Sequence, residues 1–161
     1  MALTLIVGAE RVTAPWMDAL SSAGHSVEHC TDVLSFQDRF RGAPVDVLVI
    51  DIANADHGEA MLMAQARAVW PDCRVIAMPR DRSYRSSAIF GMGLWSPDRL
   101  LMQPVDAEVL VRTVEQLRMQ SRVDRIMRER REVTGGRGRV DAAVVLQCDR
   151  REPAYGSVKA T

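Results

Sequence analysis

Lysine is almost missing from this chain of 161 residues, since Lys159 is its single lysine and arginine carries nearly all of the positive charge. We interpret this shortage as a bias of composition. Net charge is missing as well, because acidic and basic side chains balance to +0. The molecule as a whole therefore gives no electrostatic reason to expect nucleic acid or a membrane surface as a partner.

Cysteine is scarce, with Cys30, Cys73 and Cys148 far apart in the sequence. Their odd number and the lack of a C-x-x-C pair argue against a zinc site and against a disulfide framework. We expect buried thiols in a reducing cytoplasm. No apolar run reaches the roughly 18 residues of a membrane span, and the first residues, MALTLIVGAE, predict a strand and not a signal peptide.

Short apolar runs alternate with stretches of helical spacing over the first 120 residues or so. Strands are predicted at 3–7, 25–30, 45–50, 74–78 and 100–102, and helices at 16–23, 33–40, 61–70, 84–90 and from 107 onward. Alternation of this kind is typical of a parallel sheet with helices on both faces. The predicted fold class is therefore α/β, a doubly wound sheet of five parallel strands.

The functional crevice of such a sheet lies at the carboxyl ends of its strands. One acid, Asp51, follows the apolar run of VDVLVIDIAN directly. The topology is expected to gather the following residues around it: Gly8, Ala9, Glu10, Pro79, Gln103 and Pro104.

Four segments, LIVGAE, VLVIDIAN, VIAMP and LLMQPVD, stand at the ends of the predicted strands. Their spacing resembles the receiver domain of bacterial response regulators, over residues 3–120. The resemblance implies a doubly wound receiver fold. It also implies that Asp51 stands where the family accepts a phosphoryl group from a histidine kinase.

The resemblance fails where the family binds magnesium. Gly8 and Ala9 occupy the positions of its acid pair, and only the neighbouring Glu10 is acidic. Magnesium requires hard oxygen ligands in near-octahedral geometry. We therefore expect no metal and no cofactor, with Glu10 and Asp51 as the ligands if magnesium binds after all.

The other family positions are altered too. Pro79 replaces a hydroxyl residue and has no donor, while Gln103, before Pro104, replaces a lysine and carries no charge. The family's aromatic switch residue corresponds to Leu100, or to Trp95 if the alignment shifts.

Phosphoryl transfer depends on positioning and on charge neutralisation, so an anion attached to Asp51 is expected to find no fixed cation. The loss of the acid pair also removes repulsion around Asp51, which we expect to bond to backbone amides instead. The sequence thus predicts a degenerate receiver, not an enzyme, that acts through a protein partner such as a histidine kinase. Two alternatives stay open: a working phosphorelay receiver phosphorylated on Asp51, and a module that binds a small ligand in the emptied crevice.

The last predicted helix is long. Asp106 is its expected N-cap, and Leu110, Val114 and Leu117 form a stripe suited to packing on the sheet. Beyond the stripe, a four–three spacing typical of a coiled-coil seam joins Met119, Val123, Ile126, Arg130 and Val133. This part is either a solvated extension or a helix that binds a partner or forms a homodimer.

The glycines from Gly135 onward are predicted to end that helix, and their Arg/Gly run fits a flexible linker better than a nucleic-acid contact. Residues 140–146 are then a short strand or a docking segment, and residues 149–161 are disordered. The predicted organisation is a receiver-like domain at 1–120, a helical extension at 121–134 and a flexible tail at 135–161.

Overall fold

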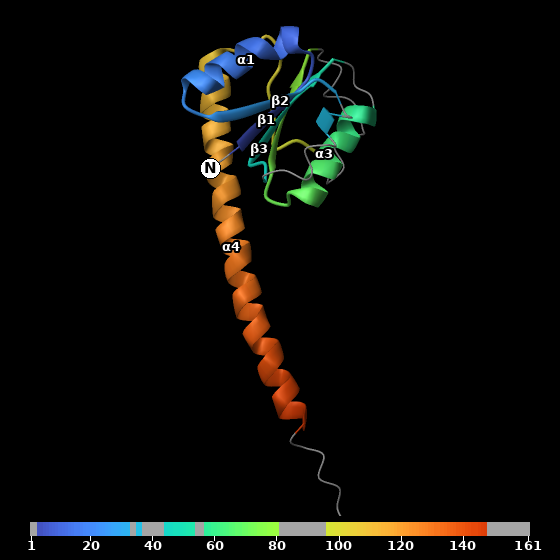
Figure 1. The fold of residues 1–161 in the computed structure, drawn as a ribbon, viewed down its shortest axis with the longest axis vertical. Helices are drawn as coiled ribbons and strands as arrows, with labels where there is room; N and C mark the ends of the chain where they lie inside the picture. Colours follow the sequence, from blue (N-terminus) through green and yellow to red (C-terminus); the bar gives the residue numbers. More distant parts are fainter. Residues whose placement is uncertain (1–2, 33–34, 37–43, 54–56, 81–95, 148–161) are drawn as a thin grey trace, which may run out of the picture. The chain divides into compact units, whose positions relative to one another are not determined.

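A computed structural model describes residues 3–32, 35–36, 44–53, 57–80 and 96–147 (Figure 1). The chain divides into two compact units, Met1–Arg125 and Ile126–Thr161. Its elements follow one another as β1 (Leu3–Val7), α1 (Glu10–Ser22), β2 (Ser26–Cys30), β3 (Val47–Ile52), α3 (His57–Val69), β4 (Arg74–Pro79), β5 (Arg99–Leu100) and α4 (Ala107–Gln147).

The five strands form one sheet in the order β2-β1-β3-β4-β5, and every neighbouring pair is parallel. Strands β1 and β3 are buried along their whole length. Continuous apolar runs are what a strand covered on both faces requires. The predicted doubly wound five-stranded sheet is therefore confirmed.

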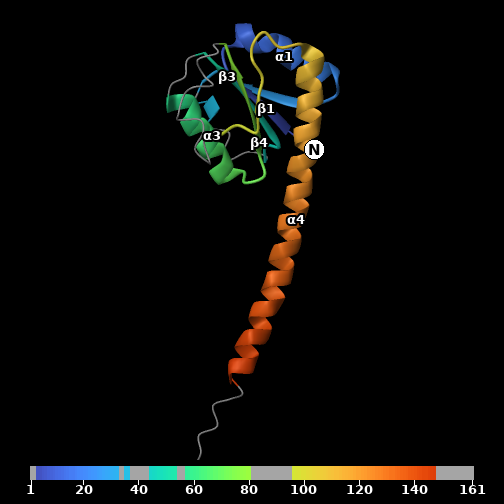
Figure 2. The same cartoon turned by 180° about the vertical axis from the view of Figure 1, so that it is seen from behind.

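Helix α3 covers one face of the sheet, as Figures 1 and 2 both show. There the side chains of Leu62 and Trp70 pack with Leu5, Leu48 and Val75, which lie opposite one another in the register of three adjacent strands. Phe36 joins this core through an edge-to-face contact with Trp70, with ring centroids 6.0 Å apart. Such aromatic pairs add stability beyond the apolar area that they bury.

Helix α1 and the first turns of α4 cover the opposite face (Figure 2). Trp16 of α1 packs there with Ile6, Val49 and Ile76 of the sheet. The predicted stripe of α4 joins the same core, with Leu110, Val114 and Leu117 buried. The sequence-based interpretation of that helical face is confirmed.

Three strands end at residues other than those predicted, and the smallest difference is in β4, which continues by one residue to Pro79. Strand β3 continues to Ile52, so Asp51 lies inside the strand, opposite Met78 in the register, and not beyond its tip. Strand β5 ends at Leu100, although backbone hydrogen bonds from Leu101 to Ala77 (3.0 Å) and from Gln103 to Pro79 (3.0 Å) extend the same edge.

Helix α4 begins at Ala107, and the Asp106 carboxylate accepts a hydrogen bond from the Glu108 backbone N–H at 2.8 Å, which confirms the predicted N-cap. The predicted end of the helix at Gly135 is wrong, because α4 continues through the glycines to Gln147. For the same reason residues 140–146 are not the short strand that was one of the two predictions for them, while the other, a docking segment, stays a prediction. A glycine costs a helix about 1 kcal/mol relative to alanine but, unlike proline, removes no backbone donor and creates no clash.

The apolar side chains of the predicted coiled-coil seam are exposed. Met119 and Val123, in the first unit, are 69% and 57% exposed. Ile126 and Val133, in the second unit, are 43% and 69% exposed. The helical nature of residues 119–133 is thus confirmed, while partner binding and dimerisation stay predictions.

Several predictions fall outside the described residues. These are most of the helix at 33–40, the helix at 84–90, Trp95 as a switch residue, Cys148 and the disordered end at 149–161. Within the described residues, none of the helices combines the length and the apolar character needed to cross a membrane.

Candidate functional site

Asp51 lies near the carboxyl end of β3, and its side chain is only 3% exposed. A buried carboxylate requires hydrogen bonds and a compensating charge, because desolvation penalises the ionised form. Within the described residues, the carboxylate takes these from the side chains of Arg80 and Gln103. The described residues therefore do not show the predicted hydrogen bonds from backbone amides to Asp51.

Arg80 follows β4 directly and supplies the charge. Its Nε donates to Asp51 Oδ1 at 3.2 Å, and its Nη2 donates to Asp51 Oδ2 at 2.5 Å. This two-pronged geometry matches a guanidinium to a carboxylate. The hydrogen bond to Asp51 raises the pKa of Arg80 above its usual value. The expectation of a pocket without a fixed cation is therefore wrong.

Gln103 holds the other side of Asp51. Its Nε2 donates to Asp51 Oδ1 at 2.8 Å and to the Met78 backbone carbonyl at 2.6 Å, so both amide hydrogens are used. The peptide bond between Gln103 and Pro104 is cis, and Pro104 is exposed. Gln103 therefore bridges β3 and β4.

Gly8 approaches Asp51 from the end of β1. A Cβ placed on Gly8 would lie 2.5 Å from the Asp51 Cβ, 3.3 Å from Asp51 Oδ2 and 3.0 Å from Thr13 Cγ2. Carbon atoms do not approach that closely, so a side chain at Gly8 requires Asp51 to move. The glycine at position 8 is thus part of the packing around Asp51.

Ala9 and Glu10 lie at the start of α1, Ala9 as its N-cap and Glu10 in its first turn, and both are exposed. Within the described residues, no three His, Cys, Asp or Glu side chains come together as metal ligands. Pro79 is buried and pairs with Ile52 in the register. The strand ends thus bring Gly8, Asp51, Pro79, Arg80 and Gln103 together, as the topology predicted for all of them but Arg80.

His29 and Thr13 fix the loop that contains Gly8. The Nε2 of His29 lies 2.9 Å from the Gly8 carbonyl oxygen and 2.9 Å from Thr13 Oγ1. A carbonyl oxygen only accepts, so Nε2 carries the proton and donates. The Thr13 hydroxyl in turn donates to the Ala9 carbonyl at 3.3 Å.

Sequence reasoning missed Arg80, His29 and Thr13 as parts of this site. A signal existed for Arg80, because it directly follows Pro79 at the end of the strand next to β3. His29 and Thr13 offered none, since their contact depends on how α1 packs against β2.

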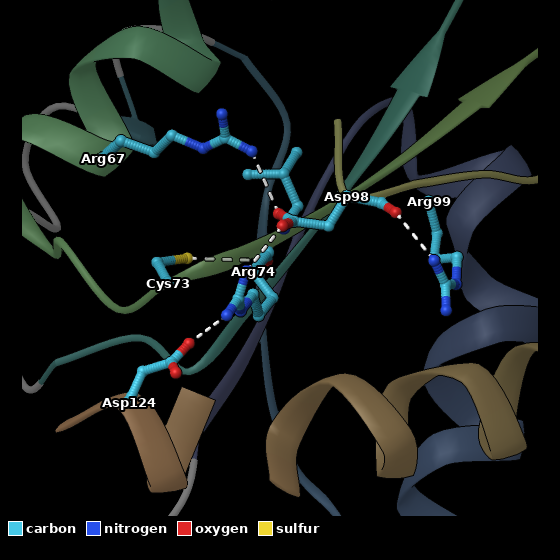
Figure 3. Close-up of polar contacts among 7 residues, drawn as sticks. Arg67, Cys73, Arg74, Asp98, Arg99 and Asp124 are labelled. Carbon is cyan, nitrogen blue, oxygen red and sulfur yellow. Dashed lines mark hydrogen bonds and ion pairs between the residues drawn. The ribbon is translucent and has the colours of Figure 1, made fainter. Parts of the chain in front are cut away.

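A second charged cluster lies at the amino end of β4, away from Asp51 (Figure 3). The Asp98 carboxylate accepts from the Val75 backbone N–H (2.8 Å), from Arg67 Nη2 (3.0 Å) and from Arg74 Nη1 (2.9 Å). Arg74 also pairs with Asp124 of α4. Burial by itself raises the pKa of Asp98, but these donors outweigh it and the pKa lies below its usual value.

Asp46 ties the same end of the sheet to α4. Its side chain is buried, accepts from the Leu3 backbone N–H at 2.9 Å and pairs with Arg125. Nearby, burial raises the pKa of the Cys73 thiol to about 12, so Cys73 is not reactive. This end of the sheet therefore holds structural ion pairs, and Asp51 remains the centre of the candidate site.

Comparison of the fold with solved structures identifies its class. The chain superimposes on a CheY-like response regulator receiver domain from Methanospirillum hungatei with a TM-score of 0.64, at 19% identity, over 76% of this chain and 98% of that one. The chemotaxis response regulator CheY4 of Vibrio cholerae gives 0.62 at 18% identity, over 73% and 98%. An adenylate cyclase structure from Rhodopirellula baltica gives 0.67 at 13% identity, over 79% and 94%.

No protein-family model and no curated protein sequence matches the chain. The agreement therefore concerns three-dimensional structure and extends over nearly the full length of the matched domains. The chain has the fold of response regulator receiver domains.

Proposed function

We propose that this protein is a signalling module of the two-component type that contacts a protein partner while Asp51 stays unphosphorylated. The observation that carries the proposal is the pairing of Arg80 with Asp51. Both oxygens of the carboxylate accept hydrogen bonds from side chains, and one positive charge already neutralises it.

Phosphorylation of Asp51 requires one of these oxygens to attack a phosphorus atom. The hydrogen bonds from Arg80 and Gln103 lower the nucleophilicity of both oxygens, and moving Arg80 aside would leave a buried charge without its partner. Among the described residues, Arg80 is the guanidinium that contacts Asp51, whereas transfer of a dianionic phosphoryl group depends on nearly complete charge neutralisation. The close contact between Gly8 and Asp51 leaves no space for a metal-binding side chain at position 8.

A pocket whose charges are neutralised without a metal ion or a phosphoryl group also favours one conformation. Gln103 joins Asp51 to the Met78 carbonyl, and Gly8 packs against the same carboxylate. These contacts involve the ends of β1, β3, β4 and the segment after β5. We propose that they hold the domain in a single state, in which a histidine kinase or another signalling protein binds it.

The experiment is incubation of the purified protein with acetyl phosphate and Mg²⁺, followed by intact-mass measurement under acidic quench. We expect the mass to stay that of the unmodified chain, while a conventional receiver domain treated in parallel gains one phosphoryl group. A phosphoryl adduct that disappears in the Asp51→Asn variant would overturn the proposal.

The second candidate function is a working phosphorelay receiver, and Arg80 is the observation that favours it. A guanidinium beside the acceptor oxygen supplies part of the charge that lysine and metal supply elsewhere. On this hypothesis the wild-type protein takes up the phosphoryl group and the Arg80→Ala variant does not. Titration with Mg²⁺ under the same assay shows whether Glu10 and Asp51 bind the ion.

A further inference from the structure

The helical part of the second unit exposes apolar side chains. Ile126 is 43%, Met127 is 49% and Val133 is 69% exposed. Ile126 and Val133 belong to the four–three spacing at 119, 123, 126, 130 and 133. Repeated exposure of large apolar side chains at this spacing indicates a surface that packs against another helix.

Arg130 interrupts this apolar surface. On a helix its neighbours are the residues three and four positions away, which are Ile126, Met127, Val133 and Thr134. None of the four is acidic. If another helix covers the surface, the guanidinium loses water and needs a carboxylate, because a buried charge is stable only when it is paired. The covering helix must therefore provide an acid at the level of Arg130.

We propose that this acid is Glu129 of a second copy, and that two α4 helices pair in parallel and in register over 119–133. In heptad terms Arg130 takes an a position and Glu129 the g position just before it. The g residue of one helix flanks the a residue of the other in a parallel pair. Each Glu129 then lies beside the Arg130 of the other copy, and the two contacts are related by the two-fold axis.

The charge at position 130 also sets the register. A single polar or charged residue at an a position fixes the register and the oligomeric state of a coiled coil and lowers its stability. The seam is only about two heptads long, so we expect dimerisation that depends on concentration. This pairing does not depend on whether Asp51 accepts a phosphoryl group. The phosphorylation assay and the dimerisation assay can therefore fail independently of each other.

The test is charge exchange, followed by analytical ultracentrifugation of the full chain across a concentration series. Glu129→Arg and Arg130→Glu each place like charges together and are expected to weaken the dimer roughly tenfold or more. The double exchange, Glu129→Arg with Arg130→Glu, restores opposite charges and is expected to restore the dimer. Glu132→Arg is the matched control, because position 132 faces away from the seam and its reversal leaves the dimer unchanged.

Register is tested by Val133→Cys in a background in which Cys148 is replaced by serine. Position 133 is a d position, so a parallel in-register pair oxidises readily to a disulfide-linked dimer. Circular dichroism confirms that each variant keeps its helix. A wild-type protein that stays monomeric at every concentration, a double exchange that fails to restore the dimer, or a Val133→Cys dimer that resists oxidation would each overturn the proposal.

Discussion

Gly8 lies so close to Asp51 that a Cβ on the glycine would fall 2.5 Å from the Cβ of the acid. The backbone of Gly8 also has φ of +154°, a conformation that other residues rarely adopt. Space and backbone conformation therefore both require glycine at this position. The absence of an acid here is part of how the chain packs.

Replacement of Gly8 by alanine or aspartate is expected to lower the free energy of unfolding by about 1–3 kcal/mol, the usual cost of overpacking a filled site. Urea denaturation checks this. Ala9→Asp is the matched control, because Ala9 is an exposed N-cap without a side-chain cap and an acid there stabilises helices. Equal denaturation midpoints for Gly8→Ala and the wild type would contradict the close contact.

Removal of Arg80 is expected to destabilise the fold because it leaves the buried Asp51 without its cation. Loss of one partner of a fully buried pair costs about 3–5 kcal/mol. Since the Arg80 side chain is 36% exposed, we expect about 1–3 kcal/mol for Arg80→Ala. A double-mutant cycle with Asp51→Asn isolates the pair, and additive effects of the two changes would show that the two residues do not interact.

Asp98 is expected to contribute stability that disappears in acid. Its folded pKa lies below the usual 3.8, so its contribution is fully present above that value and is lost as pH falls through the lower folded pKa. Asp98→Asn is expected to cost about 1–3 kcal/mol near neutral pH, because Arg67, Arg74 and the Val75 N–H lose a charged acceptor. Denaturation at pH 7 and near pH 2 measures the effect, and a cost that does not shrink in acid would refute this assignment.

His25 is expected to make the fold sensitive to mild acid. Its side chain is 3% exposed, its Nδ1 accepts from Arg118 at 3.1 Å, and its Nε2 lies 4.0 Å from Glu115 Oε1 without a hydrogen-bond partner in the described residues. Burial, and then the charge of Arg118, lower the pKa of His25 below 6.5, while Glu115 opposes this.

Because the unfolded chain binds a proton at His25 more readily than the folded one, stability is expected to fall as pH drops below 6.5. His25→Asn should remove this part of the slope, and Glu115→Gln should make the slope steeper by deleting the opposing charge. Thermal denaturation between pH 7 and pH 5 measures both variants. Identical slopes for the wild type and His25→Asn would exclude His25 as the cause.

The order of elements followed from the sequence because buried parallel strands need unbroken apolar runs, and residues 3–7 and 74–78 are such runs. The gathering of Asp51, Pro79 and Gln103 followed as well, since the carboxyl ends of neighbouring parallel strands lie side by side. The position at which α4 ends did not follow from the sequence. Glycine lowers the stability of a helix only moderately, and no residue at 135–138 is incompatible with a helix.

By itself the sequence determined the doubly wound fold, the place of Asp51 near the carboxyl end of its strand and the absence of acidic side chains at Gly8 and Ala9, because these depend on residue order and strand direction. The charge around Asp51 was decided by tertiary structure. Arg80 is 29 positions away in the sequence, and only the pairing of β3 with β4 brings its guanidinium onto the carboxylate. A count of charges along a chain cannot show which two of them meet, since an ion pair depends on distances of a few ångströms that the packed sheet alone fixes.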